Sequence, residues 1–154
     1  MEYLILFLPL IGSIISGFFG KLIGDKISQI LTCLFVSISA ILSLVIFFKV
    51  INDGYVNNLI ISTWINSGSL NVNWSINIDA LSSVMLVVVT LISSLVHIYS
   101  IGYMSHDPHK PRFMSYLSLF TFAMLILVTS DNFIQLFFGW EGVGLCSYFL
   151  IGFW

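Results

Sequence analysis

The chain has 154 residues, of which 58% are hydrophobic and 8% are charged. Soluble domains have about 25% charged residues, so this composition leaves too few polar groups to cover a water-soluble globule. The formal net charge of −2 is small, and the absence of a basic cluster argues against a nucleic-acid partner. Cys33 and Cys146 both fall within apolar runs, which argues against a disulfide or zinc framework.

Five apolar runs are each long enough to cross a hydrocarbon core, which takes about 20 residues. Four of them contain no Asp, Glu, Lys or Arg and are 18 to 22 residues long, and the fifth contains a single acidic residue. We therefore predict an all-α membrane protein with five transmembrane helices. The runs are Tyr3–Gly20, Ile27–Phe48, Ala80–Ile101, Phe113–Ser130 and Asn132–Trp154.

The first run differs from a secretory signal. Its leader carries Glu2 rather than a basic residue, and no small-x-small cleavage site is followed by a soluble domain. We therefore expect a retained span. Pro9 lies within it and is tolerable in a bundle, where neighbouring helices satisfy the carbonyl that proline frees.

The basic residues predict the orientation. Lys21 and Lys26 lie in the first connection, and Lys110 and Arg112 lie in the third, whereas Lys49 is at the end of the second run. Basic residues gather on the cytoplasmic or matrix side of membrane proteins. The N-terminus is therefore predicted to lie outside, with Lys49 extending its ammonium group toward the outer interface.

The outer connection, residues 52–78, is the one sizeable segment outside the predicted spans. Apolar and polar residues alternate along Leu70–Ile78, which is typical of a strand. A second strand over Leu59–Ile65, joined through the turn residues Asn66–Ser69, would complete a short β-hairpin. The alternative is a flexible loop held at the interface by Trp64 and Trp74.

Glu141 is the only Asp, Glu, Lys or Arg in the fifth run. It lies nine residues from the start of the run, roughly 13–14 Å along a helix and therefore near the middle of the membrane. A carboxylate there costs about 2.5–3.5 kcal/mol on insertion scales, so a proton or ion site is expected. The alternative is a protonated, hydrogen-bonded glutamate that only holds helices together.

Three glycines surround this glutamate. Gly139, Gly142 and Cys146 fall near one helix face, where small residues let a neighbouring helix approach closely. Gly144 lies beside Glu141 on the next turn and leaves room there for water or a partner side chain.

His97 lies near the inner end of the third run. A neutral imidazole is a competent proton relay, and a hydrogen-bonded histidine at the membrane interface is the structural alternative.

Other polar residues have simpler interpretations. The loop from His106 to Arg112 holds two histidines and an aspartate, but its prolines and the lack of further ligands make it a poor metal site. Asp79 and Asp131 each precede an apolar run and are predicted to cap helix N-termini. No phosphate loop, nucleotide fold or cysteine ligand set is recognisable.

Three stretches resemble one family. Ile78–Ser82, Val96–Met104 and Asp131–Leu145, which contains Gly-Trp-Glu-Gly-Val-Gly, are similar to the N-terminal part of the antiporter-like subunit of respiratory complex I, called subunit L or chain 5. Members of that family are several times larger, so residues 1–154 are expected to be the N-terminal transmembrane part of such a subunit.

The resemblance implies a function in proton translocation coupled to NADH oxidation and quinone reduction. It places Glu141 in the proton pathway, paired with a lysine on a later helix, so the 154-residue chain alone is not expected to be catalytic. It also implies that NADH, flavin, iron–sulfur clusters and quinone bind other subunits, and that this chain binds no cofactor or metal. The expected partners are other membrane-arm subunits and the lipid of a bacterial or mitochondrial inner membrane.

Two other functions stay open on the sequence. The large subunit of multisubunit sodium/proton antiporters shares the Gly-Trp-Glu helix, and a non-pumping structural fragment would need no proton site.

Overall fold

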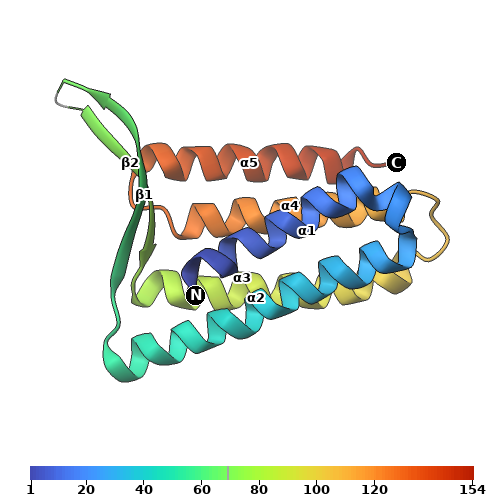
Figure 1. Cartoon of the computed structure of the whole chain (residues 1–154), viewed down its shortest axis with the longest axis horizontal. Coiled ribbons are helices and arrows are strands. Elements are labelled where there is room, and N and C mark those ends of the chain that lie inside the picture. Colours follow the sequence, from blue (N-terminus) through green and yellow to red (C-terminus); the bar gives the residue numbers. More distant parts are fainter. Residues whose placement is uncertain (69) are drawn as a thin grey trace.

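The computed structural model describes residues 1–68 and 70–154. Over these residues the chain forms five α-helices and one antiparallel pair of strands (Figure 1). The elements are α1 (Glu2–Ile23), α2 (Asp25–Asp53), β1 (Asn57–Ser67), β2 (Leu70–Ile78), α3 (Ala80–Tyr103), α4 (Lys110–Val128) and α5 (Phe133–Ile151). The five predicted helices are thus confirmed, and all five are long and apolar enough to be candidate membrane spans.

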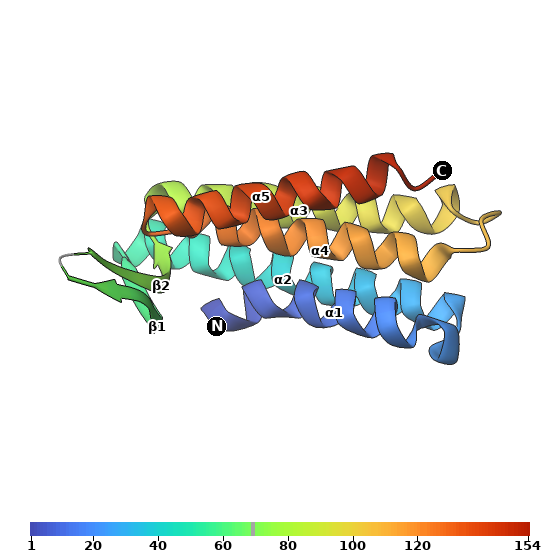
Figure 2. The same cartoon turned by 90° about the horizontal axis from the view of Figure 1, so that it is seen from above.

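The helices lie side by side, and the hairpin projects across one end of the bundle (Figures 1 and 2). The N-terminus lies at the hairpin end, whereas the C-terminus and the α1–α2 and α3–α4 connections lie at the opposite end. α4 contacts all four other helices, so it is the centre of the packing.

Most helix ends differ by a few residues from the predicted runs, and two of the larger differences have a local cause. α2 continues past Phe48 to Asp53 and ends at Gly54, whose φ of 62° is left-handed, a conformation that glycine adopts at little cost. α4 begins at Lys110 rather than Phe113, with Pro111 in its first turn, where proline removes no helical hydrogen bond. Both extensions are polar helix ends that reach beyond the apolar runs.

Hydroxyl groups join the helices to one another. Ser43 Oγ of α2 lies 2.7 Å from Thr90 Oγ1 of α3, and Ser115 Oγ of α4 donates to the carbonyl of Ser13 in α1 at 2.8 Å. Ser16 of α1 donates to the carbonyl of Pro111 at 2.7 Å. Small polar residues of this kind allow close packing and supply interhelical hydrogen bonds, since lipid offers no hydrophobic drive for helix association.

The predicted hairpin is confirmed, although Ser69 in its turn lies outside the described residues. β1 and β2 are antiparallel: Asn57 lies opposite Ile78 at one end of the ladder, and Ser67 lies opposite Leu70 at the other. The register is irregular after Ile60 and after Thr63. β1 is mostly exposed, whereas Ile76 and Ile78 of β2 are buried. β2 therefore provides the buried side chains of the hairpin.

Gln135 fixes the hairpin to the start of α5. Its side chain is fully buried, donates to the carbonyl of Ser75 at 2.7 Å and accepts from the amide of Ser75 at 3.1 Å. The amide of Asn77 donates to the carbonyl of Thr129, at the end of α4, at 2.8 Å. Trp64 and Trp74 pack edge-on against Phe138 of α5, so these tryptophans contact protein rather than serving only as interface anchors.

The two predicted helix caps have different outcomes. Asp79 caps α3 as expected, accepting from the amide of Ser82 at 2.7 Å in a reciprocal capping box, and this backbone N–H holds the pKa of the Asp79 carboxyl below its usual value. The prediction for Asp131 is wrong. Asn132 caps α5 by accepting from the amide of Gln135, because Asn132 has the extended backbone that an N-cap needs, while the exposed Asp131 accepts from Asn58.

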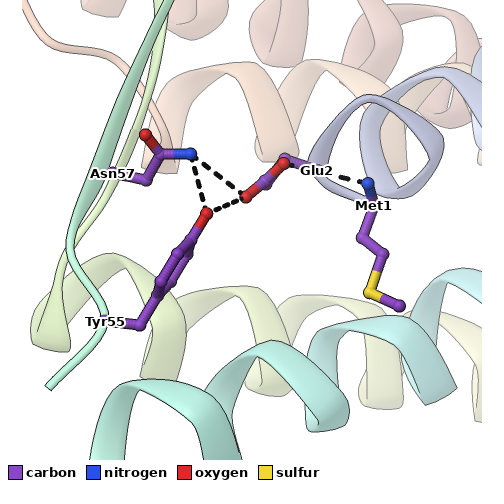
Figure 3. A network of polar contacts seen from close by, with 4 residues as sticks. All are labelled: Met1, Glu2, Tyr55 and Asn57. Carbon is purple, nitrogen blue, oxygen red and sulfur yellow. Dashed lines mark hydrogen bonds and ion pairs between the residues drawn. The ribbon is translucent and has the colours of Figure 1, made fainter. Parts of the chain in front are cut away.

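The start of α1 is tied to the base of the hairpin (Figure 3). Tyr55 Oη donates to Glu2 Oε1 at 2.6 Å, and Asn57 Nδ2 contacts both groups. The hydrogen bond to the Glu2 carboxylate raises the pKa of the Tyr55 phenol. Glu2, which had no evident role in the sequence, thus anchors the N-terminus at the hairpin end of the bundle.

Candidate functional site

α5 presents two different faces. Gln135, Gly139 and Cys146 are buried against the bundle, and they recur every four to seven residues, as one face of a helix requires. The opposite face carries the large exposed side chains of Phe137, Trp140 and Tyr148. α5 is the least covered of the five helices, because only 17% of its 18-residue apolar stretch is buried. One side of this helix is therefore open.

Glu141 lies on the open side and in the middle of α5. It is the ninth of the 19 residues of the helix and follows the buried Gly139 by two positions, roughly 200° around the helix. Its side chain is exposed in this chain. Among the described residues, the ion pairs are Met1–Glu2 and Lys110–Asp25, so the Glu141 carboxylate has no cation beside it here.

Glycines bring α5 very close to α4. A Cβ atom at Gly139 would lie 2.8 Å from the backbone N and Cα of Leu127, and one at Gly142 would lie 3.2 Å from Cβ of Ala123. These distances confirm the predicted close-packing role of this face. Gly144 differs, because a Cβ there meets nothing within 4 Å. The space beside Glu141 is therefore open on the side where Gly144 lies.

His97 is buried between α3 and α4 rather than exposed at an interface. Its Nδ1 lies 2.8 Å from the carbonyl oxygen of Ser93, and its Nε2 lies 3.0 Å from Oγ of Ser118. A carbonyl only accepts, so Nδ1 carries the proton and Nε2 accepts from the Ser118 hydroxyl. Both ring nitrogens are thus satisfied in the neutral imidazole.

The structure does not bring His97 and Glu141 together. His97 bonds residues of α3 and α4, whereas Glu141 projects from the far side of α5, and α4 packs against both α3 and α5. A short chain of hydroxyls does continue from His97, because its Nδ1 also lies 3.4 Å from Oγ of Ser93, and that hydroxyl bonds Thr121 of α4. No hydrogen bond recorded over the described residues extends this chain to α5.

The loop between α3 and α4 is a turn held by its own polar groups. Asp107 accepts from the backbone amide of His109 at 2.6 Å. Over residues 1–68 and 70–154, no cluster of three His, Cys, Asp or Glu side chains is placed to hold a metal ion.

Sequence reasoning missed two sets of polar residues. The first is Gln135, whose position one turn into an apolar run is a signal for a buried hydrogen bond. The second is the set of hydroxyls at the helix contacts, which recur at helical spacing along four of the apolar runs. They are Ser13 and Ser16 in α1, Ser28, Thr32, Ser39 and Ser43 in α2, Thr90 and Ser93 in α3, and Ser115, Ser118 and Thr121 in α4.

Comparisons with known proteins agree with this architecture. Residues 64–114 match a family model described as the N-terminus of chain 5 of NADH-ubiquinone oxidoreductase (complex I). The whole chain is 58% identical to NADH-ubiquinone oxidoreductase chain 5 of Arabidopsis thaliana and 56% identical to NADH-quinone oxidoreductase subunit L of Rickettsia felis. Over its whole length, the chain is therefore similar to part of complex I chain 5 and subunit L.

The chain spans about a quarter of the length of these relatives. It covers 23% of the Arabidopsis thaliana protein and 24% of the Rickettsia felis protein. A relative from Phytophthora infestans, 57% identical over 150 residues, is likewise covered to 23%. Relatives in the chain 5 family therefore have a large amount of sequence that is available to cover the open side of α5.

Gly139 and Gly144, which lie on different faces of α5, provide a matched test of this packing. Gly139→Ala places a methyl group against the backbone of Leu127, which cannot move aside as a side chain can, so we expect a loss of about 1–3 kcal/mol in the free energy of unfolding. Gly144→Ala meets open space and should be neutral or stabilising by up to about 1 kcal/mol. Unfolding of both variants in mixed micelles measures the difference. Equal stability of the two variants would contradict the close approach of α5 to α4.

Proposed function

We propose that this chain is part of a proton-translocating membrane-arm subunit of NADH:quinone oxidoreductase, and that Glu141 binds the translocated proton. The observation that supports this function is a lone carboxyl group halfway along α5, on the face that the rest of this chain leaves open. Ionisable residues inside membranes face a bundle interior or a water-filled cavity and mark ion or proton pathways.

The chemistry follows from the surroundings of the carboxyl group. Low dielectric favours its neutral, protonated form, and a cation brought close favours the ionised form. A cation that approaches and withdraws would therefore release and reload the proton. We propose that this cation is a lysine on a helix that lies beyond residue 154 in the longer protein.

His97 has a different role in this proposal. Its hydrogen bond to Ser118 ties α3 to α4, and its bond to the carbonyl of Ser93 fixes the ring within α3, so we assign it primarily to positioning these helices. A relay function would need one of these bonds to break, and the hydroxyl of Thr121 is the nearest recorded extension of the chain.

The redox chemistry would take place on other chains of the complex. NADH, flavin, iron–sulfur clusters and quinone would bind those partners, and this chain would contribute the membrane step of the oxidoreductase in a bacterial or mitochondrial inner membrane. The relatives named above are complex I subunits, which supports this function over a sodium/proton antiporter.

The proposed orientation places the hairpin outside and the α1–α2 and α3–α4 connections in the cytoplasm or matrix, since four of the five basic residues lie at that end. Cysteines introduced at Ser67 and Ser105, both exposed, should react with an impermeant thiol reagent from opposite sides of the membrane. The native Cys33 and Cys146 are buried and are removed as a precaution. Labelling of both positions from the same side would overturn the topology.

Replacement of Glu141 tests the proposed function directly. Glu141→Gln keeps the size of the side chain but cannot release a proton, so in the full-length subunit within its complex we expect the translocation that runs through this subunit to fall at least about tenfold. Assembly should survive, because glutamine removes the cost of a charge in the membrane. The measurement is proton translocation per NADH oxidised in reconstituted vesicles.

The matched control is Asp131→Asn, the same chemical change at an exposed residue just before the same helix. Within the described part of the chain, its one hydrogen bond is with Asn58, so this variant should pump nearly normally. Normal pumping by Glu141→Gln, or a severe defect in Asp131→Asn, would show that the wrong acid has been identified.

A further inference from the structure

A cavity of about 420 Å³ lies at the end of the bundle opposite the hairpin. It is formed where α2 and α4 begin and α3 ends. Its lining residues are Asp25, Lys26, Gln29, Ile30, Ile101, Ser105 and Lys110. None of them takes part in the site around Glu141, and their position at the polar ends of three apolar helices places the cavity at the boundary between lipid and water.

The charge around this cavity is positive. Lys26 and Lys110 contribute two positive charges, and Asp25, whose carboxylate lies 4.0 Å from Nζ of Lys110, contributes one negative charge. The N-terminal ends of α2 and α4 add positive potential, because the peptide dipoles of a helix point their positive ends to its N-terminus. The C-terminal end of α3 opposes them with one negative helix end, so an excess of positive potential remains.

Gln29 supplies a hydrogen-bond donor without a partner. Its side chain is 6% exposed, and its Nε2 has no hydrogen-bond partner among the described residues. A buried donor left unpaired costs about 1–3 kcal/mol, so proteins rarely retain one unless something fills the site. An acceptor oxygen in the cavity would satisfy it. The hydroxyl of Ser105 is a further polar group in the lining.

The lining also has an apolar side. Ile30 and Ile101 are exposed and belong to the lipid-facing parts of α2 and α3, next to the lysines and Gln29. A ligand that fits this arrangement has an anionic, acceptor-rich group at one end and a hydrocarbon part at the other. A phospholipid has both.

We propose that this cavity binds the phosphate group of an anionic phospholipid. Lys26 and Lys110 pair with the phosphate, Gln29 donates a hydrogen bond to one of its oxygens, and Ile30 and Ile101 contact the first methylene groups of the acyl chains. Basic pockets between transmembrane helices at the membrane surface suit lipid head groups, and hydrogen bonds to an ionised acceptor are the stronger ones. The other source of the same chemistry is free phosphate.

The test uses the full-length subunit in its membrane complex and a phosphatidylglycerol probe with a photoactivatable group near the glycerol. Labelling of the peptides that contain Ile30 and Ile101 is quantified by mass spectrometry. Lys26→Gln should lower this labelling about fivefold, and Gln29→Leu should lower it at least about tenfold. The matched control is Lys21→Gln, which removes an exposed lysine at the same end but outside the cavity and should change labelling less than about twofold.

Gln29→Leu also separates a ligand site from a packing defect, since replacing an unpartnered buried amide with leucine is expected to leave the stability of the fold nearly unchanged. Unchanged labelling in this variant, or equal labelling by a diacylglycerol probe that lacks phosphate, would overturn the proposal. A large excess of inorganic phosphate should leave labelling intact. If it abolishes labelling, the cavity holds free phosphate and the assignment to a lipid is wrong.

Discussion

A polar group within a hydrocarbon core has to be satisfied inside the protein, because lipid offers neither hydrogen bonds nor counter-ions. The contacts among α1–α4 follow this constraint closely. Their hydroxyls bond one another or a backbone carbonyl of the same or a neighbouring helix, as Ser43 does with Thr90 and Ser115 with Ser13. The His97 ring has a partner on both nitrogens. The same rule makes Glu141 exceptional, because its carboxyl group has no ionic partner among residues 1–68 and 70–154.

The two faces of α5 explain how one helix serves both structure and chemistry. On one face, Gly139 and Gly142 let α5 lie against the backbone of α4, and Gln135 fixes its first turn to the hairpin. These contacts set the rotation of the helix about its axis. Because the rotation is fixed, Glu141 is held on the opposite face, toward whatever covers that face in the longer protein. Packing on one side thus determines the direction of the carboxyl group on the other.

Much of this architecture could be predicted from the sequence, because lipid imposes length and apolarity on every span. The five helices, the strand alternation of Leu70–Ile78 and the capping role of Asp79 all follow from local pattern. The cap of α5 could not be assigned with certainty, since Asp131 and Asn132 are both good caps and only the backbone conformation decides between them. Partners in three dimensions, such as Ser118 for His97 and Ser75 for Gln135, depend on helix rotation, which one sequence does not specify.

The same limit applies to the candidate site. The position of Glu141 in the middle of a span was readable from its distance to the start of the run, but the direction in which its side chain points was not.

The central claim is that the face of α5 bearing Glu141 is covered by protein and not by lipid in the full-length subunit. The most direct measurement is the rate of collision with oxygen of nitroxide labels at positions 141 and 148 in that subunit, because oxygen concentrates in lipid. A low rate at both positions is predicted, and a high rate typical of a lipid-facing side chain would contradict the claim.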